Sequence, residues 1–548
     1  MLKINCPVCE TEFEIREDYL GRKLQCSSCN SKFYAWRDEK SGEILAEPLN
    51  QSVSKWIRCP HCWNYFDYRE INYISRHIDL LGDNVLGPEA QSRFLPLRFS
   101  ANGLAIDARG NECHEMACPR CHLKIVDTMV DLPTSFFSIV GSPASGKSYF
   151  LTAMIWQARK YLPKYFEYNM TDVDPEFNGV LNGYERTLFL SKEPDRAIAL
   201  PKTELQGVGY SNQVLLDGVQ VDLPRPFIFS LSPMPAHPLY ATKRDMLERN
   251  VVFYDNAGEH FEPGRETASN LATLHLIYSD GIIFLYDPLQ DMRFRSECSE
   301  DDPQVQQLES ANQVTLFNEM TSRIRQFTGL HPGEKYRQPL VIVIAKFDAL
   351  KDAFDFPVEE DAYIRYDEEK MEYYLDIQCI ANVSFLLRQK MLDIAPDMVA
   401  TAEAFSDTVY FVPASAFGCS PEVIEGAGQL PNGKNMLGIR PEMIKPLWIE
   451  VPFLLQAYLH GLIEGRICQV PDAEEIANYK VFEDSIVFAF PGSRTRVQLP
   501  ANYSGIAVYC RENGKYYKVP AFEGDTPASA GKTAPLERQI DSDFWSRQ

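Results

Sequence analysis

The sequence has no excess of basic residues and no long apolar run. Its 548 residues include 54 Lys and Arg against 76 Asp and Glu, a formal net charge of −22. Because non-specific binding to nucleic acid and to anionic membranes depends on basic surface, this balance disfavours both kinds of partner. The most apolar runs, residues 281–286 and 340–345, are too short to span a bilayer and predict buried parallel strands. No apolar segment typical of a secretory signal follows Met1, so we expect a cytoplasmic protein.

The cysteines predict metal binding rather than disulfides. Nine of the 14 cysteines lie before residue 122. The first four form two C-x-x-C turns separated by residues 10–25: Cys6, Cys9, Cys26 and Cys29. This spacing is typical of a zinc ribbon, in which two such turns direct four thiolates at one ion. Residues 1–37 are therefore predicted to form a zinc ribbon, and a redox pair is the alternative.

A second set of C-x-x-C turns is separated by a longer gap, residues 63–117. Its members are Cys59, Cys62, Cys118 and Cys121. The gap is long for one ribbon, so the chain between the pairs must fold back to bring them together. Four neighbours in the sequence are alternative ligands: Cys113, His114, His61 and His122. Residues 56–130 are predicted to form a second zinc-binding module. The C-x-x-C-H pattern at residues 118–122 also matches a c-type haem attachment site, which would require export.

Residues 141–148, Gly-Ser-Pro-Ala-Ser-Gly-Lys-Ser, match the phosphate-binding pattern G-x-x-x-x-G-K-[ST]. The pattern follows an apolar run, residues 136–140, and opens a helical pattern, residues 147–161. Backbone N–H groups of such a loop and the N-terminus of the helix surround phosphate oxygens. The predicted phosphate-binding residues are Gly141, Ser145, Gly146, Lys147 and Ser148, and the Ser148 hydroxyl would also ligate Mg²⁺. The alternative is a chance Gly/Ser turn, but the flanking elements favour a nucleoside triphosphate site.

Three shorter motifs follow, each at the end of an expected strand. In D-x-x-G, Asp255 would hold the Mg²⁺ shell and the Gly258 amide would contact the terminal phosphate. Two further motifs are expected to recognise guanine through Lys346, Asp348, Ser415 and Ala416. Each motif is common by chance. Their order, at the carboxyl ends of strands where α/β sheets bind ligands, strengthens the interpretation.

With these motifs in order, residues 133–465 resemble the translation-factor-related (TRAFAC) and Ras-like class of P-loop GTPases. In detail they resemble the bacterial double-GTPase type families. The resemblance implies an α/β P-loop NTPase domain with a mostly parallel sheet, preceded by small zinc-ribbon modules. It also implies Mg²⁺ and GTP or GDP as ligands. The protein would be a slow GTPase that acts as a nucleotide-controlled molecular switch.

The resemblance assigns further residues and shows two departures. Lys147, Glu259 and His260 would act at the reacting phosphate, although small GTPases have Gln at the position of Glu259. The switch threonine on Mg²⁺ would be Thr203, with Thr242 as the alternative. Ala345 replaces the usual Asn or Thr before the motif lysine, so guanine selectivity would depend mainly on Asp348.

The remaining organisation follows from hydrophobic patterning. Within the nucleotide-binding region we expect strands at residues 136–140, 226–231, 250–254, 281–286, 340–345 and 408–412. Helices are expected at residues 147–161, 265–278, 305–327, 380–390 and 451–462. Residues 165–220 and 351–375 fit no element well. Residues 466–548 are predicted to form a small β appendage, with strands near 485–490, 505–509 and 515–519, and a polar tail.

Three functional hypotheses remain open at this stage. In the first, the switch presents its mobile loops or its zinc ribbons to a protein partner. In the second, the chain is a remodelling NTPase that hydrolyses ATP or GTP. In the third, the zinc ribbons bind nucleic acid under nucleotide control, which the nearly balanced charge of residues 1–130 disfavours.

Overall fold

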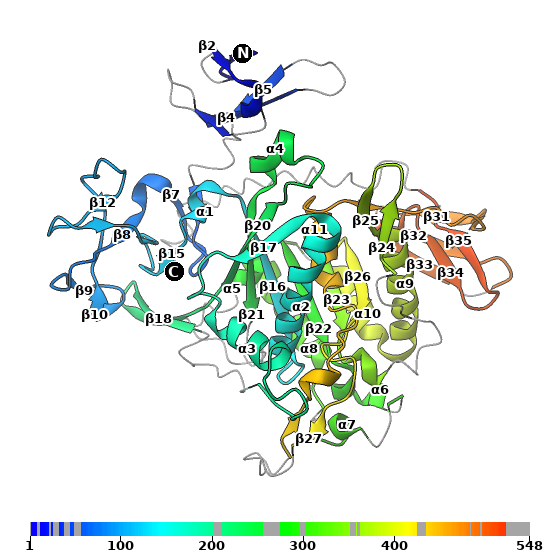
Figure 1. The fold of residues 1–548 in the computed structure, drawn as a ribbon. Coiled ribbons are helices and arrows are strands. Elements are labelled where there is room, and N and C mark those ends of the chain that lie inside the picture. Colours follow the sequence, from blue (N-terminus) through cyan, green and yellow to red (C-terminus); the bar gives the residue numbers. More distant parts are fainter. Residues whose placement is uncertain are drawn as a thin grey trace.

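The computed structural model describes residues 2–7, 11–20, 23–25, 32–37, 44–48, 56–200, 211–255, 274–295, 297–298, 302–307, 310–331, 333–350, 358, 362–424, 435–482, 484–493 and 496–521. The centre of the molecule is a seven-stranded sheet with the order β17-β20-β21-β16-β22-β23-β26 (Figure 1). Its strands are β17 (Tyr168–Asp172), β20 (Phe227–Pro233), β21 (Arg249–Asp255), β16 (Thr134–Gly141), β22 (Gly281–Tyr286), β23 (Leu340–Ile344) and β26 (Val409–Pro413).

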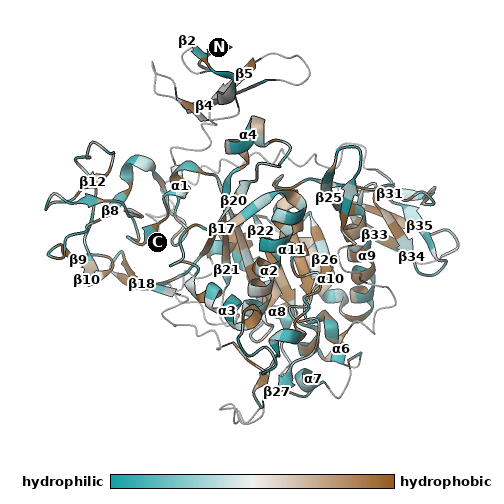
Figure 2. Ribbon diagram, in the orientation of Figure 1, coloured by the Kyte–Doolittle hydropathy of each residue, from teal (hydrophilic) through white to brown (hydrophobic). Residues whose placement is uncertain are grey.

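The sheet is largely parallel, which confirms the expected mixed α/β fold. The five strands from β21 to β26 run parallel; at one edge β20 pairs antiparallel with β21, and β17 pairs antiparallel with β20. All residues of β22 and β23 are buried, because helices cover both faces of a parallel sheet. The central strands are accordingly the most hydrophobic part of the ribbon (Figure 2).

The two faces of the sheet carry different helices. On one face, Phe453 of α11 (Val451–Leu459) packs on Phe137 of β16, beside α2 (Lys147–Tyr161). On the other face, Phe317 of α8 (Gln313–Thr328) packs on Phe284 of β22, next to α5 (Leu274–Ile277). Other helices are α3 (Gly179–Phe189), α4 (Tyr240–Leu247), α6 (Met292–Arg295), α9 (Ile377–Ile394) and α10 (Pro396–Phe405).

Several expected elements differ from the observed ones. The helix predicted over residues 305–327 is wrong as a single helix, because α7 (Pro303–Gln307) and α8 are separate and the Asn312 side chain caps α8. The stretch 165–220 contains β17, α3, β18 (Ser211–Leu216) and the start of β19 (Val219–Pro224). The stretch 351–375 contains β24 (Ile364–Asp367) and most of β25 (Glu372–Asp376).

The C-terminal strands pack against α9. They are β30 (Glu474–Glu475), β31 (Tyr479–Val481), β32 (Ser485–Ala489), β33 (Arg496–Pro500), β34 (Ala507–Cys510) and β35 (Lys515–Lys518). The Tyr503 hydroxyl lies 2.7 Å from Ser384 Oγ of α9, and the Ala507 N–H donates to Gln378 Oε1. These strands therefore share one hydrophobic core with the central sheet.

The cysteine-rich regions are built from short strands. Residues 2–48 contribute β1 (Leu2–Asn5), β2 (Glu12–Ile15), β3 (Lys23–Gln25), β4 (Lys32–Arg37) and β5 (Ile44–Pro48). The second region includes β6 (Trp56–Arg58), β7 (Tyr65–Asp67), β8 (Asn72–Ile74), β11 (Arg93–Phe94), β14 (Met116–Ala117) and β15 (Lys124–Ile125). Among the described residues, no helix combines the length and hydropathy that a membrane crossing needs.

Candidate functional site

The loop of residues 141–148 joins β16 to α2 without a gap. β16 ends at Gly141 and α2 begins at Lys147. Gly146 precedes the helix with φ +88°, a left-handed conformation that glycine adopts without strain. A Cβ atom on Gly141 would lie 2.8 Å from Leu285 O and 2.9 Å from Ser145 Oγ. Both glycines of the pattern are therefore required by the backbone geometry of this turn.

The charged and hydroxyl side chains of the loop are held in place by nearby oxygen atoms. Lys147 Nζ donates to Gly141 O at 3.0 Å and to Ser142 O at 2.8 Å, so its ammonium group lies across the loop. Ser148 Oγ donates to Asp255 Oδ2 at 2.7 Å. The structure thus brings together two of the three residues predicted to hold Mg²⁺. A hydroxyl and a carboxylate are oxygen ligands of the kind that Mg²⁺ prefers.

Asp255 is the last residue of β21 and is half-buried. Burial raises the pKa of its carboxyl group, against the opposing effects of the Lys147 charge and the Ser148 hydrogen bond. A carboxylate in such a place gains from a nearby cation, because a cation offsets the cost of burying a negative charge. The electrostatics of this corner therefore fit a divalent ion beside the loop.

The predicted base-recognition residues lie at the ends of β23 and β26. Ser415 Oγ donates to Asp348 Oδ1, whereas Asp348 Oδ2 is buried and has no hydrogen-bond partner among the described residues. Leaving a buried acceptor unsatisfied is costly, so Oδ2 is suited to a donor supplied by a ligand. The Ser415 N–H donates to Leu447 O, so the Ala416 amide is the member of the pair that could contact a guanine carbonyl.

Lys346 connects the predicted base-recognition residues to the loop of residues 141–148, the predicted phosphate loop. Its Nζ atom lies 2.6 Å from Asp287 Oδ2 and 3.4 Å from Ala144 O. Asp287 is completely buried, and Gln313 bonds both its backbone N–H and its carbonyl oxygen. This ion pair anchors Lys346 although Ala345 offers no side-chain hydrogen bond.

Sequence reasoning missed Asp287 and a second residue that follows β22. Gln290 accepts a hydrogen bond from Ser142 Oγ at 2.7 Å and donates to Pro143 O at 2.9 Å. It therefore holds the first part of the phosphate loop. Their position was a usable signal, because polar residues directly after the apolar run 281–286 lie at the carboxyl edge of the sheet.

The order of the parallel strands shows why these residues meet. Along the chain, β21 adds beside β16 on one side, and β22, β23 and β26 then add on the other side. Ligands of open α/β sheets bind at the carboxyl ends of the strands where this order reverses. That point lies between β16 and β22, which are followed by the phosphate loop and by Asp287.

Four predicted residues lie outside the described parts of the chain: Thr203, Gly258, Glu259 and His260. Their roles stay predictions. Thr242 is described and lies in α4, which leads from β20 to the start of β21. Since β21 ends at Asp255, α4 lies at the end of the sheet where β21 begins, and the loop lies at the other end. The alternative choice of Thr242 as the magnesium-binding threonine was therefore wrong.

The second cysteine set forms one cluster, as its repeated pattern predicted. The sulfur atoms of Cys59, Cys62, Cys118 and Cys121 all lie within 4.8 Å of one another, and all four residues are buried. Cys59 and Cys62 lie in the turn of the hairpin β6–β7, and Cys118 and Cys121 in the turn of β14–β15. β8 pairs with both β14 and β11, so the intervening chain folds back as expected.

The two turns have matching backbones. The Cys59 N–H donates to Asn64 O and the Cys118 N–H to Leu123 O, both at 3.0 Å. Trp63 and His122, which follow the second cysteine of each turn, have φ values of 54° and 59°. Four convergent sulfur atoms in this arrangement could bind a tetrahedral zinc ion. Burial raises the pKa values of the Cys59 and Cys121 thiols, so a cation would be needed to hold them as thiolates.

The alternative ligands point elsewhere. Cys113 Sγ is 3.8 Å from Asp107 Oδ2, His61 Nε2 is 3.0 Å from Lys124 O, and His122 Nδ1 is 2.8 Å from Asp83 Oδ2. His114 is exposed. Of the first cysteine set, Cys6 is buried, and Cys9, Cys26 and Cys29 lie outside the described residues. The first zinc site therefore stays a prediction.

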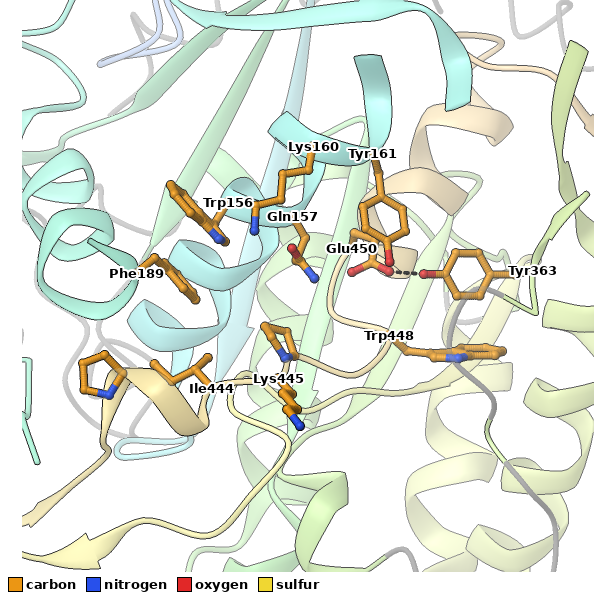
Figure 3. A pocket seen from close by; sticks show the side chains of 12 residues that line it. Trp156, Gln157, Lys160, Tyr161, Phe189, Tyr363, Ile444, Lys445, Trp448 and Glu450 are labelled. Carbon is orange, nitrogen blue, oxygen red and sulfur yellow. Dashed lines mark hydrogen bonds between the residues drawn. The ribbon is translucent and has the colours of Figure 1, made fainter. Parts of the chain in front are cut away.

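A separate cavity of about 400 Å³ lies at the far end of α2 (Figure 3). Trp156 stacks on Phe189, and the Glu450 carboxylate accepts a hydrogen bond from the Tyr363 hydroxyl. Gln157, which lines the cavity, is ten residues from Lys147, or about 15 Å along a helix. None of the predicted nucleotide-binding residues lines this cavity, so it is separate from the phosphate loop.

Comparison with known proteins adds little to this geometry. No protein-family model and no curated protein matches the sequence. Among solved structures, the chain is similar to a chain of the signal recognition particle receptor SRb-GTP/SRX complex from Chaetomium thermophilum. The match has 14% sequence identity, covers 53% of this chain and 93% of that chain, and has a TM-score of 0.21. A TM-score this low does not establish a shared fold.

Proposed function

We propose that this chain is a Mg²⁺-dependent GTP-binding protein and a slow GTPase that acts as a nucleotide-controlled switch. The observation that carries the proposal is the contact between Ser148 and Asp255, which lies beside Lys147 at the strand-order reversal. These three residues come from two motifs more than 100 residues apart, and a chance Gly/Ser turn does not account for their meeting.

Different residues of the chain would bind the phosphates, the Mg²⁺ ion and the base. Loop amides, the N-terminus of α2 and the Lys147 ammonium would hold the phosphates. Ser148 and Asp255 would hold Mg²⁺, which when bound neutralises charge on the phosphate oxygens. Asp348 and the Ala416 amide would contact the guanine edge. Thr203, Gly258, Glu259 and His260 would complete the site on the side of the terminal phosphate.

The cysteine-rich modules belong to the same proposal. The four-cysteine cluster would hold a structural zinc ion, and residues 1–37 would hold a second one. Both modules would then offer docking surfaces to a protein partner that distinguishes the GTP form from the GDP form. The nucleotide would control that interaction by ordering the loops around it.

Nucleotide-binding calorimetry on the full chain tests the proposal. With Mg²⁺ present, the wild type should bind GTP and GDP with sub-millimolar affinity. Lys147→Ala should weaken GTP binding by at least roughly tenfold, because a charge-assisted contact to phosphate is lost. Lys160→Ala is the matched control, since Lys160 lies on the same helix but lines the separate cavity.

Two outcomes would contradict the proposal. One is a wild-type chain that takes up no purine nucleoside triphosphate. The other is a Lys147→Ala chain that binds GTP as tightly as the wild type. Equal binding of ATP and GTP would instead favour the remodelling NTPase.

A further inference from the structure

One tyrosine joins the four-cysteine module to the end of β21. Tyr254 is completely buried, and its hydroxyl donates to Pro60 O at 2.6 Å and accepts a hydrogen bond from Trp63 Nε1 at 3.1 Å. Pro60 lies between Cys59 and Cys62, and Trp63 follows Cys62 directly. Both hydrogen bonds of the Tyr254 hydroxyl therefore go to the first metal-binding turn.

The next residue along the strand is Asp255, which accepts the hydrogen bond from Ser148. Successive side chains of a strand point to opposite faces, so Tyr254 faces the cysteine module while Asp255 turns to the phosphate loop. Their Cα atoms are about 3.8 Å apart. A shift of Tyr254 therefore moves the backbone that carries the Asp255 carboxylate.

The end of β21 is supported unevenly by its neighbouring strands. β16 pairs with β21 as far as Asp255, whereas the pairing of β20 with β21 ends at Phe253. Beyond Phe253, the cysteine module provides contacts through Pro60 and Trp63. The Tyr254 ring also packs between Phe136 and His275, with centroid distances of 6.5 and 5.0 Å.

We propose that Tyr254 is a positioning residue through which the four-cysteine module orients Asp255 toward Ser148 and so sets the Mg²⁺ affinity of the nucleotide site. This inference rests on the proposed function. It assigns the module an effect on nucleotide binding besides any docking of partners. The contact belongs to the cysteine turn itself, because Trp63 has the positive φ that follows Cys62 in this turn.

The tyrosine hydroxyl separates this role from simple core packing. A phenylalanine fills the same space among Phe136, Trp63 and His275, but it cannot bond Pro60 O or Trp63 Nε1. Tyr254→Phe therefore removes the link and keeps the aromatic core. Trp63→Phe removes the indole donor from the other side and serves as a second variant.

The experiment measures GTP affinity by calorimetry over a series of Mg²⁺ concentrations, together with bound zinc and the thermal transition of each variant. Tyr254→Phe should raise the Mg²⁺ concentration needed for half-maximal GTP affinity by about threefold to tenfold, the usual effect of one or two hydrogen bonds. GTP affinity without added Mg²⁺ should stay at the wild-type value. Trp63→Phe should shift the Mg²⁺ dependence in the same direction.

Tyr503→Phe is the matched control, because Tyr503 is also completely buried and its hydroxyl bonds Ser384 Oγ in the C-terminal region. It should leave the Mg²⁺ dependence unchanged. The inference is overturned if both Tyr254→Phe and Trp63→Phe keep the wild-type Mg²⁺ dependence, or if they weaken GTP binding equally with and without Mg²⁺. A wild type that binds no GTP overturns the proposed function as well, so the two failures are distinguishable.

Discussion

Eight consecutive residues, 141–148, form the predicted phosphate loop, whereas the four-cysteine cluster gathers two pairs of cysteines separated by residues 63–117. In the loop, Gly146 and Gly141 allow the turn, and the side chains of Lys147 and Ser148 are anchored to oxygen atoms nearby. In the cluster, the hairpins β6–β7 and β14–β15 bring the sulfur atoms together. The loop is formed by consecutive residues, although one of its partners, Asp255, lies far away in the sequence. The cluster is formed by two turns that lie far apart in the sequence and meet in the fold.

This difference predicts different responses to substitution. The loop keeps its backbone as long as its glycines and β16 remain. The cluster buries four thiols in a small module, and such modules commonly depend on metal for their stability. Removing one ligand should therefore affect the cluster far more than removing one side chain affects the fold of the loop.

The largest expected effect is that of Cys118→Ser. A serine hydroxyl is a poor replacement for a thiolate ligand, so the chain should lose about one bound zinc ion. The module should also unfold at lower temperature, by an amount that reflects several kcal/mol of metal-binding energy. Plasma emission spectrometry measures the zinc, and differential scanning calorimetry measures the unfolding.

Cys113→Ser is the control for this variant. Cys113 is buried in the same module, but its sulfur points to Asp107 and to Asn111 O rather than to the cluster. It should retain the wild-type zinc content. Equal zinc loss in Cys113→Ser and Cys118→Ser would show that the four sulfur atoms are not the ligand set.

The predicted base-recognition residues are the part of the proposed nucleotide site that depends, like the cluster, on distant segments. Asp348→Asn should weaken GTP binding by about tenfold, because the buried carboxylate acceptor is lost. ATP binding, which does not use this carboxylate, should change little. Competition between GTP and ATP for the full chain measures the preference.

A modified base provides a complementary test of the same residues. The Asn amide offers an N–H where Asp348 accepts, so xanthosine triphosphate, which has a carbonyl oxygen in place of the guanine amino group, should bind the variant better than the wild type. If Asp348→Asn leaves the order of GTP, ATP and xanthosine triphosphate unchanged, the base does not lie against Asp348.

The sequence predicted the elements that have strong local signals. α2 was expected over residues 147–161 and is observed there, because the phosphate-loop pattern fixes its start. The strand expected over residues 281–286 is β22, since a run of six residues rich in β-branched and aromatic side chains favours a buried strand over a helix. The edge strand β17 was missed because Tyr168–Asp172 alternates buried and exposed side chains instead of forming an apolar run.

Other features could not be predicted because they depend on contacts between distant segments. Nothing near Lys346 indicates that a buried Asp287 will pair with it, and nothing near Tyr254 indicates that its partner is Pro60, 194 residues earlier. The break between α7 and α8 is different, since Asn312 is a usual helix N-cap residue and provided a local signal. The motifs therefore identified the candidate site residues, and only the fold showed which side chains hold them in place.

The last expected effect is on stability alone and lies in a helix interface that belongs to neither region. Glu185 of α3 is buried, 3.5 Å from Arg159 of α2. Burial raises its pKa from 4.5 to about 7; Arg159 opposes this shift, and Asp172 adds to it. An acid whose pKa is higher in the folded state costs stability as the pH rises from about 4.5 through about 7, because the unfolded chain ionises more readily.

Glu185→Gln should therefore stabilise the protein relative to the wild type at pH 8 and should have little effect at pH 5. The gain at pH 8 is at most about 3 kcal/mol, since each unit of pKa shift corresponds to about 1.4 kcal/mol and the lost ion pair reduces the gain. Thermal unfolding at the two pH values measures it, and the exposed residue Glu193 provides the control variant Glu193→Gln. Zinc content and GTP affinity should not change. Within the described residues, the charged neighbours of Glu185 are Arg159 and Asp172, which belong neither to the cysteine cluster nor to the loop of residues 141–148. A stability difference that is the same at pH 5 and pH 8 would show that Glu185 is already ionised at pH 5.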